Sequence, residues 1–181
     1  GKSTLIDILM GLLELQGGRL IVDDKSINSQ NMKLWQKKIS HIPQQTGFKD
    51  SSILENITFS LGGNKIDKER LIESSINAEI YDFIKSKENG FDTIIGEKGV
   101  KLSGGQRQRI AIARALYSNK EILFLDEATN ALNVEIEEKI FDNILNKVEN
   151  KTIIVISHRD KIIDYFNSVY KVENKSVFKF K

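Results

Sequence analysis

Two short stretches of this chain combine residue types that hold phosphates and a metal ion. Residues 101–109 read Lys-Leu-Ser-Gly-Gly-Gln-Arg-Gln-Arg, and residues 121–127 read Glu-Ile-Leu-Phe-Leu-Asp-Glu. Adjacent glycines at the start of a helix leave backbone N–H groups open to an anion. An apolar strand that ends in two acids delivers carboxylates suited to a hard cation. Together the stretches predict a site for a phosphate ligand and a divalent metal ion.

The first stretch holds a candidate anion site at Ser103, Gly104, Gly105 and Gln106. The serine offers a hydroxyl, the two glycines offer unencumbered N–H groups, and the glutamine can add a side-chain amide. A glycine turn that merely enters a helix is the simpler alternative.

The second stretch ends in Asp126 and Glu127. An ionised carboxylate at the end of a buried strand needs a partner to offset its desolvation, and a nucleotide-bound Mg²⁺ is such a partner for Asp126. Glu127 is then free to act on a water molecule. The alternative is that two acids simply favour the N-terminus of the segment that follows.

The chain begins with Gly1-Lys-Ser-Thr4. Lys2 is a point charge suited to β- and γ-phosphates, the Ser3 hydroxyl is a hard oxygen ligand for Mg²⁺, and Thr4 can add a phosphate contact. Taken alone, the run is better explained as an ordinary capped helix start. Its place ahead of the other two stretches favours a phosphate site.

A complete phosphate-binding loop reads G-x-x-x-x-G-K-[ST]. Only its last three positions are present here, and residue 1 is not Met. We therefore expect the 181 residues to be a fragment that begins inside this loop.

The apolar pattern predicts a parallel sheet that positions these groups. Residues Ile122–Leu125 and Thr152–Ile156 are continuous apolar runs, typical of parallel strands covered on both faces, and Val134–Val148 is the expected crossover helix. Asp126 and His158 then follow the carboxyl ends of two strands, where open α/β sheets bind ligands.

Further elements are expected on either side of these strands. A mostly buried helix over Lys2–Leu13 should close at the glycine pair 17–18. Residues 66–87 show a charged helical pattern with one apolar face, which indicates a separate helical lobe. The other expected elements are strands at Leu20–Val22 and at Ile39–Ile42, the latter stopped by Pro43, and a helix that follows Ser103 and continues to Leu116.

Composition excludes several classes of protein. Lys and Arg total 27 against 25 Asp and Glu, so no basic surface favours nucleic acid as a partner. The chain contains no Cys, which removes disulfides and thiolate metal sites. Its longest apolar runs are strand-sized, against the roughly 20 residues of a membrane helix, so none is expected within the sequence.

The ordered set of motifs resembles the nucleotide-binding domain of an ATP-binding cassette (ABC) ATPase, truncated within its Walker A motif. The resemblance implies an α/β P-loop NTPase (RecA-like) core with a mostly parallel sheet and an inserted α-helical subdomain. Over residues 1–181 it places the core at about 1–48 and 119–181 and the helical subdomain at about 49–118.

The resemblance also assigns roles to individual residues, with ATP and Mg²⁺ as ligands. It makes Glu127 the catalytic base, His158 in Ile-Ser-His-Arg the switch histidine at the γ-phosphate, and Gln44 in Ile-Pro-Gln-Gln the glutamine that senses Mg²⁺ and the attacking water. The other histidine, His41, has no role in this scheme. The implied nucleotide contacts are Gly1, Lys2, Ser3, Thr4, Ser103, Gly104, Gly105 and Gln106, and the implied metal contacts are Ser3, Gln44 and Asp126.

In this family the signature serine and glycines grip nucleotide bound to a second subunit, so a dimer partner is implied. One position departs from the family pattern. The run after Glu127 usually ends in Asp, and Asn133 stands there instead. An amide keeps an acceptor but loses the charge that helps order the dimer interface, so coupling between subunits and turnover are placed in doubt more than nucleotide affinity.

Two segments resemble the exporter type of cassette. These are residues 50–59 and residues 90–99, which in exporters lie near the transmembrane domain, with Glu97 at the centre of the second. The implied function is ATP hydrolysis that drives export or the flipping of lipids or glycans, at the cytoplasmic face of a membrane, with a transmembrane domain upstream of this chain. A weakly hydrolysing or non-hydrolysing regulatory cassette and a soluble non-transport ABC ATPase are the alternatives.

Overall fold

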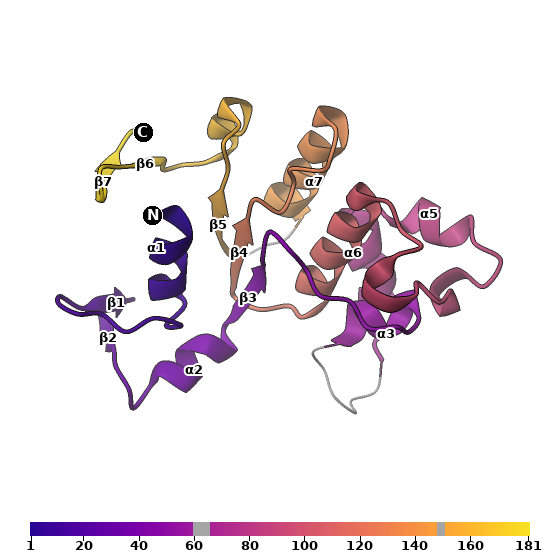
Figure 1. Ribbon diagram of the computed structural model, residues 1–181, viewed down its shortest axis with the longest axis horizontal. Helices are drawn as coiled ribbons and strands as arrows, with labels where there is room; N and C mark the ends of the chain where they lie inside the picture. The colour runs from indigo at the N-terminus through magenta and orange to yellow at the C-terminus, as the bar shows by residue number, and fades with distance from the viewer. Residues whose placement is uncertain (60–65, 148–150) are drawn as a thin grey trace.

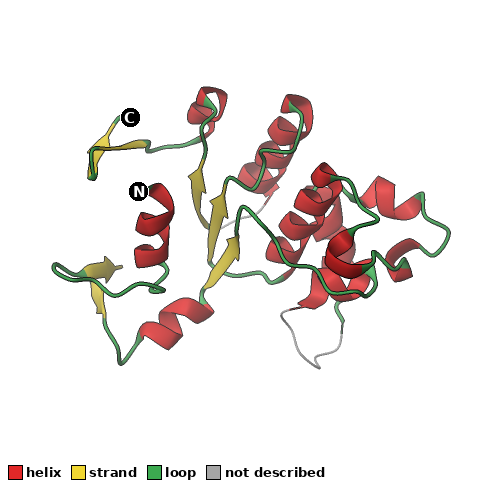
Figure 2. Ribbon diagram, in the orientation of Figure 1, coloured by secondary structure: helices red, strands yellow, loops and turns green. Residues whose placement is uncertain are grey.

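The structure is a computed structural model in which residues 1–59, 66–147 and 151–181 are described (Figure 1). Helices flank a small central sheet, and two short hairpins lie apart from it on one side of the molecule (Figure 2). This is the layered α/β arrangement that the sequence predicts.

The central sheet is parallel, in the order β3–β4–β5. Its strands are Ile39–Ile42, Ile122–Asp126 and Thr152–Ile156. Asp126 pairs with Ile156 across the second ladder, so the strands end at the same edge of the sheet. The three predicted strands are confirmed, as is the parallel direction predicted for the two strands at residues 122–125 and 152–156, and β3 is parallel to them.

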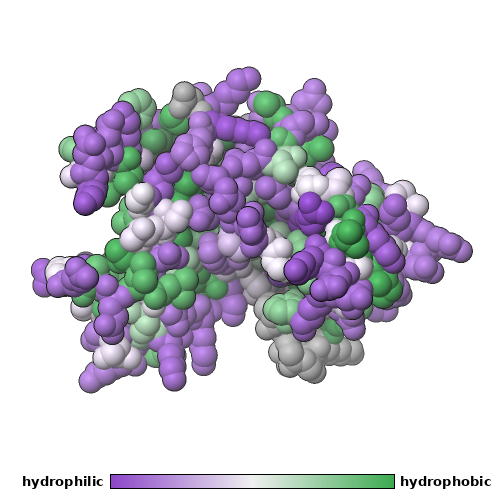
Figure 3. Space-filling view, viewed as in Figure 1, coloured by the Kyte–Doolittle hydropathy of each residue, from purple (hydrophilic) through white to green (hydrophobic). Residues whose placement is uncertain are grey.

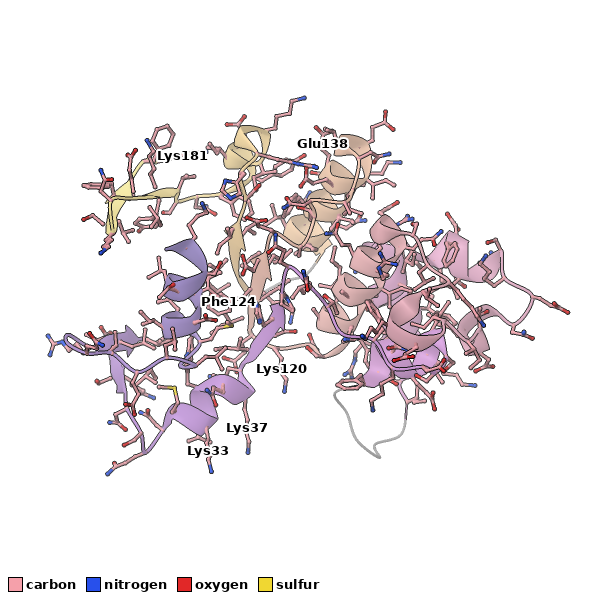
Figure 4. All side chains as sticks on the ribbon, in the orientation of Figure 1. Lys33, Lys37, Lys120, Phe124, Glu138 and Lys181 are labelled. Atoms are coloured by element: carbon pink, nitrogen blue, oxygen red, sulfur yellow. The ribbon has the colours of Figure 1, made fainter. Side chains whose placement is uncertain are left out.

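Successive residues of β4 face opposite layers, as a strand requires. Leu123 and Leu125 belong to the apolar cluster shared with α6 (Gly104–Tyr117) and α7 (Val134–Lys147). Phe124, labelled in Figure 4, is fully buried on the other face, with α1 (Lys2–Leu9) and α2 (Met32–Lys37). Burial on both faces explains the continuous apolar run of this strand.

The crossover helix was predicted over residues 134–148. The structure confirms it as α7, which carries the chain from β4 back to β5. Val148, the last residue of the predicted range, lies outside the described residues.

A group of helices lies beside the sheet, on the right in Figure 1. Within it α6 packs against α3 and α4, and two 3₁₀ turns, η2 and η3, lead into the start of α6. The group falls within the predicted helical subdomain of residues 49–118, of which residues 60–65 are not described. The elements not yet given bounds are α3 (Ile53–Thr58), α4 (Lys68–Asn77), α5 (Tyr81–Lys85), η2 (Gly90–Asp92) and η3 (Glu97–Gly99).

The helical pattern predicted over residues 66–87 forms two helices, because the chain breaks between α4 and α5. Glu79 at the break has a left-handed φ of 54°. Arg109 from α6 donates to the carbonyl oxygen of Glu79, and the Asn143 amide donates to its carboxylate at 3.0 Å. Contacts with two distant helices thus hold a backbone conformation that the local apolar pattern does not specify.

The helix expected over residues 2–13 is also too long, since α1 ends at Leu9. Gly11 has a left-handed φ of 69°, which does not continue the helix, and a Cβ built on it would lie 2.0 Å from Sδ of Met32, so the position requires glycine. Leu12 and Leu13 are consequently 61% and 47% exposed rather than buried. Figure 3 shows apolar side chains gathered on the surface around α1 and the β1–β2 hairpin.

Two antiparallel hairpins complete the fold. The first joins β1 (Leu20–Val22), which the sequence predicts, to β2 (Lys25–Ile27), which it does not. The second joins β6 (Tyr170–Glu173) to β7 (Ser176–Lys179) after the 3₁₀ segment η4 (Asp160–Tyr165). Both turn on two residues of positive φ, the backbone of a two-residue hairpin loop. Among the described residues, no helix combines the length and apolarity that crossing a bilayer demands.

Candidate nucleotide-binding and catalytic site

The carboxylate of Glu127 is the centre of the site, and three side chains contact it. Oε2 accepts hydrogen bonds from the amides of Gln44 and Asn130, each at 2.8 Å. Oε1 lies 2.9 Å from Nε2 of His158. The glutamate side chain is only 17% exposed, although His158 itself is 64% exposed. Three polar groups from three segments therefore orient one carboxylate at the surface of the sheet edge.

Strand topology brings these groups together. Gln44 follows β3 by two residues, Glu127 follows β4 directly, and His158 follows β5 by two residues. Parallel strands in register end at one edge, so residues more than 80 positions apart in sequence meet there. The structure thus groups the three side chains that the sequence proposes as catalytic.

Glu127 has an unusual backbone conformation, with a φ of 50°. Its N–H donates to the carbonyl oxygen of Ile156 at 3.1 Å, so the end of the β4–β5 ladder holds this turn. A left-handed conformation at a residue other than glycine costs roughly 1–2 kcal/mol. Such a cost at a residue aimed by three neighbours is typical of a functional position.

Asp126 lies beside Glu127 but in a different environment. Burial raises the pKa of its carboxyl, and the nearby acids Glu127 and Asp7 raise it further. His41 and the facing Ser3 hydroxyl lower it, but the net direction is upward. Burial thus disfavours the ionised form of this carboxyl, and a bound cation would oppose that effect. The structure also brings Ser3 to Asp126, as the sequence predicts for two metal contacts.

These oxygen donors fit Mg²⁺. A hydroxyl and a partly buried carboxylate are hard ligands, and Mg²⁺ is commonly held by one or two carboxylates together with substrate phosphates. Among the described residues, no group of three or more His, Cys, Asp or Glu could hold a metal by itself. Gln44 donates its amide nitrogen to Glu127, and its predicted metal contact stays a prediction.

The predicted phosphate contacts lie at the start of α1. Gly1 is its N-cap and makes no side-chain capping bond, and the described first turn holds no acid. Ser3 and Thr4 are exposed and Lys2 is partly exposed. Backbone N–H groups at a helix start, together with a lysine, favour an anion. The predicted assignment of Gly1–Thr4 to the phosphates is compatible with this geometry.

The predicted signature residues form a different part of the molecule. The Ser103 hydroxyl accepts from the N–H of Gln106 at 3.2 Å, and the Gln106 side chain accepts from the N–H of Ser103 at 2.9 Å. This capping box starts α6. A Cβ on Gly105 would lie 3.3 Å from the carbonyl oxygen of Ala131, so the helix start packs against the segment after β4.

The signature and the phosphate contacts do not meet within one chain. Among the described residues, no hydrogen bond joins Ser103, Gly104, Gly105 or Gln106 to Lys2, Ser3 or Glu127. In Figure 4, Lys33, Lys37 and Lys120 extend from the lower edge of the molecule, opposite the edge where the strands end.

Three residues at this edge were missed by the sequence reasoning. Asn130 donates to Glu127, and Arg159 forms an ion pair with Glu137. Asn130 lies three positions after Glu127 and Arg159 directly follows His158, which is the only signal the sequence carries. Asn133 has a local role, because its side-chain oxygen accepts from the N–H of Ile136 at 2.9 Å and so caps α7.

The fold and site define a class of protein. A lysine and serine at a helix start, an acid-terminated strand inside a parallel sheet, and polar side chains at the adjoining strand ends are the features of a P-loop nucleotide-binding domain. A sequence profile of the family described as ABC transporter matches residues 1–130. The chain belongs to this family.

Similar proteins include bacterial exporters. The chain is 38% identical to the alpha-hemolysin translocation ATP-binding protein HlyB of Escherichia coli over 96% of its own residues and 24% of that protein. It is 38% identical to the ATP-dependent lipid A-core flippase of Saccharophagus degradans over 96% of its residues and 29% of the flippase. A bacterial Atm1-family ABC exporter with ATP bound superimposes with a TM-score of 0.84 at 34% identity, covering 91% of this chain and 28% of the exporter. The chain therefore spans only about a quarter of the length of these relatives.

Proposed function

We propose that this chain binds and hydrolyses ATP as the nucleotide-binding domain of an exporter or of a lipid or glycan flippase. The observation that carries the proposal is the Glu127 carboxylate, which three side chains orient beside the Ser3 and Asp126 pair. Two relatives, a lipid A-core flippase and a β-(1→2)glucan exporter, support the class of transported molecule.

Each group has a role in phosphoryl transfer to water. Lys2 and the N–H groups at the start of α1 neutralise the phosphates, and Ser3 and Asp126 hold the metal. When bound, Mg²⁺ would supply positive charge that neutralises the phosphates. Glu127 orients the attacking water and accepts its proton, while His158 holds Glu127 in place and faces the γ-phosphate. Positioning and electrostatics carry this chemistry without a covalent intermediate.

The complete transporter in this proposal contains domains beyond this chain. Because Ser103 and its neighbours do not reach the phosphate contacts of their own chain, they complete the site of a second nucleotide-binding domain. The coverage of the relatives supports a transmembrane domain in the same polypeptide, with this domain at the cytoplasmic face of the membrane.

A weakly hydrolysing regulatory cassette is the second candidate function. Asn133 favours it, since an amide replaces the charge expected in the segment between Glu127 and α7. Gln44, Asn130 and His158 also occupy three of the roughly four acceptor positions of the Glu127 carboxylate, which leaves little room for a water molecule.

The decisive experiment is Glu127→Gln in the complete exporter. This change removes the base but keeps size and hydrogen bonding, so steady-state hydrolysis should fall by about 100-fold or more, the usual range for a general base, while ATP-bound dimers accumulate. Glu138→Gln is the matched control, because Glu138 is exposed on α7 (Figure 4). If Glu127→Gln turns over ATP as fast as the wild type, Glu127 is not the catalytic base. If the wild type itself shows negligible turnover, the regulatory cassette is favoured.

A further inference from the structure

Arg159 ties together two loops at the edge of the sheet. Its Nη1 lies 2.6 Å from Oε2 of Glu137 on α7. Its Nη2 donates to the carbonyl oxygens of Asn130 and Leu132, at 3.1 and 3.2 Å. One guanidinium thus joins the loop after β5 to α7 and to the segment between β4 and α7, which we call the 130–132 loop.

The contacts of Arg159 close a ring around Glu127. Asn130 is held through its backbone by Arg159, and its side chain donates to Oε2 of Glu127. Oε1 of the same carboxylate meets His158, the residue before Arg159. Arg159 is therefore linked to both groups that orient Glu127 from this side. It is hydrogen-bonded to the backbone carbonyl of Asn130, and it is covalently joined to His158 as the next residue in the chain.

Glu137 anchors the ring on α7. Its side chain is only 4% exposed, and Oε1 is buried without a hydrogen-bond partner among the described residues. Among the described residues, Arg159 is therefore the group that compensates this carboxylate, and its loss would leave a buried charge unpaired. The N–H of Arg159 also donates to Oγ of Ser157 at 2.9 Å, which fixes the turn that carries His158.

The geometry needs an arginine. A guanidinium presents several N–H donors in a fixed plane and can contact a carboxylate and two carbonyls at once. A lysine ammonium could keep the ion pair, but its single nitrogen cannot reproduce the spread of the three acceptors.

We propose that Arg159, anchored by Glu137, is a positioning residue that keeps Asn130 and His158 on Glu127 during ATP hydrolysis. This inference rests on the proposed function of Glu127. Loss of the guanidinium releases the 130–132 loop and the His158 turn together, so Glu127 loses its orientation. In the described part of the chain no hydrogen bond joins the phosphate contacts on α1 to the ring, so nucleotide affinity should change little.

The test compares Arg159→Ala, Arg159→Lys and Glu137→Gln in the complete exporter. We expect kcat to fall at least 10-fold in Arg159→Ala and by an intermediate factor in Arg159→Lys, with the dissociation constant for ATP within two-fold of wild type. Millimolar guanidinium should restore part of the activity of Arg159→Ala. Arg70→Lys is the matched control, because Arg70 forms an exposed ion pair with Asp67 on α4.

Two results would overturn the inference. One is unchanged kcat in Arg159→Ala. The other is a parallel loss of kcat and ATP affinity with a lowered melting temperature in all three variants, including the shape-conserving Glu137→Gln, which would mean a merely structural ion pair. Glu127→Gln measured alongside separates the two proposals: if it retains turnover, the proposed function fails, and if it abolishes turnover while Arg159→Ala does not reduce it, only the ring is wrong.

Discussion

Nε2 of His158 lies 2.9 Å from Oε1 of Glu127 in a chain where the two residues end neighbouring strands. The histidine is mostly exposed and the glutamate is mostly buried. An exposed imidazole can therefore contact both the glutamate and a ligand that arrives from solvent.

His158→Ala should reduce hydrolysis by about 100-fold, in the lower range for a group that assists proton transfer. It removes one of three contacts that orient Glu127 and leaves Gln44 and Asn130 in place. Affinity for ATP should change little. Single-turnover hydrolysis and equilibrium nucleotide binding, measured on the same preparation, check both expectations, and an equal loss of both would show that the histidine acts mainly in binding.

Asp126→Asn should distinguish a role of Asp126 in metal binding from a role in the stability of the fold. Burial raises the pKa of this carboxyl, so its ionised form is disfavoured until a cation opposes it. Without Mg²⁺ the variant should melt at the same or a higher temperature than wild type. With Mg-ATP the wild type should be stabilised and the variant should not, whereas equal stabilisation of both would exclude Asp126 as a metal contact.

His41 should make stability depend on pH. Burial lowers its pKa from the ordinary value of 6.5, partly opposed by Asp126 and Asp7, and its Nε2 is buried without a partner among the described residues. Because the pKa is lowered in the folded state, His41 does not oppose folding above pH 6.5, where it is neutral in both the folded and the unfolded chain. As the pH drops below 6.5 the unfolded chain takes up the proton first, so the stability of the folded state falls.

His41→Leu tests that origin of the pH dependence. It removes the buried Nε2 atom, whose lack of a hydrogen-bond partner costs about 1 kcal/mol of stability. It should also weaken the loss of stability at acid pH. Thermal unfolding between about pH 5 and 8 measures it, since these limits bracket the titration of histidine. An acid decline as steep in the variant as in wild type would assign it to other groups.

Ser103→Arg should inactivate the dimer without preventing ATP from binding to one chain. Ser103 caps α6 and contacts no described phosphate residue of its own chain, so its predicted ligand belongs to the partner. Replacing the cap costs about 1 kcal/mol, which the fold should tolerate. Mixing this variant with Lys2→Ala should restore at most one composite site per dimer. Failure of monomeric Ser103→Arg to bind ATP would contradict an action across the dimer.

Local patterns predicted the elements that position the site. The apolar runs that become β4 and β5 are continuous because both faces are buried, and the helix predicted after Ser103 is present, with a capping box at its start that the structure reveals. The same reasoning overextended α1 and missed the break at Glu79, because a close approach of Met32 to Gly11 and contacts from α6 and α7 decide those positions.

The sequence by itself determined which groups can do chemistry here: a lysine and serine at a helix start, two acids after a buried strand, and a glutamine and histidine after two others. Tertiary structure alone decided that Gln44, Asn130 and His158 share one carboxylate and that Arg159 joins the loops that carry two of them. Strand pairing brings together residues far apart along the chain, and the direction of a side chain depends on partners that no local pattern specifies.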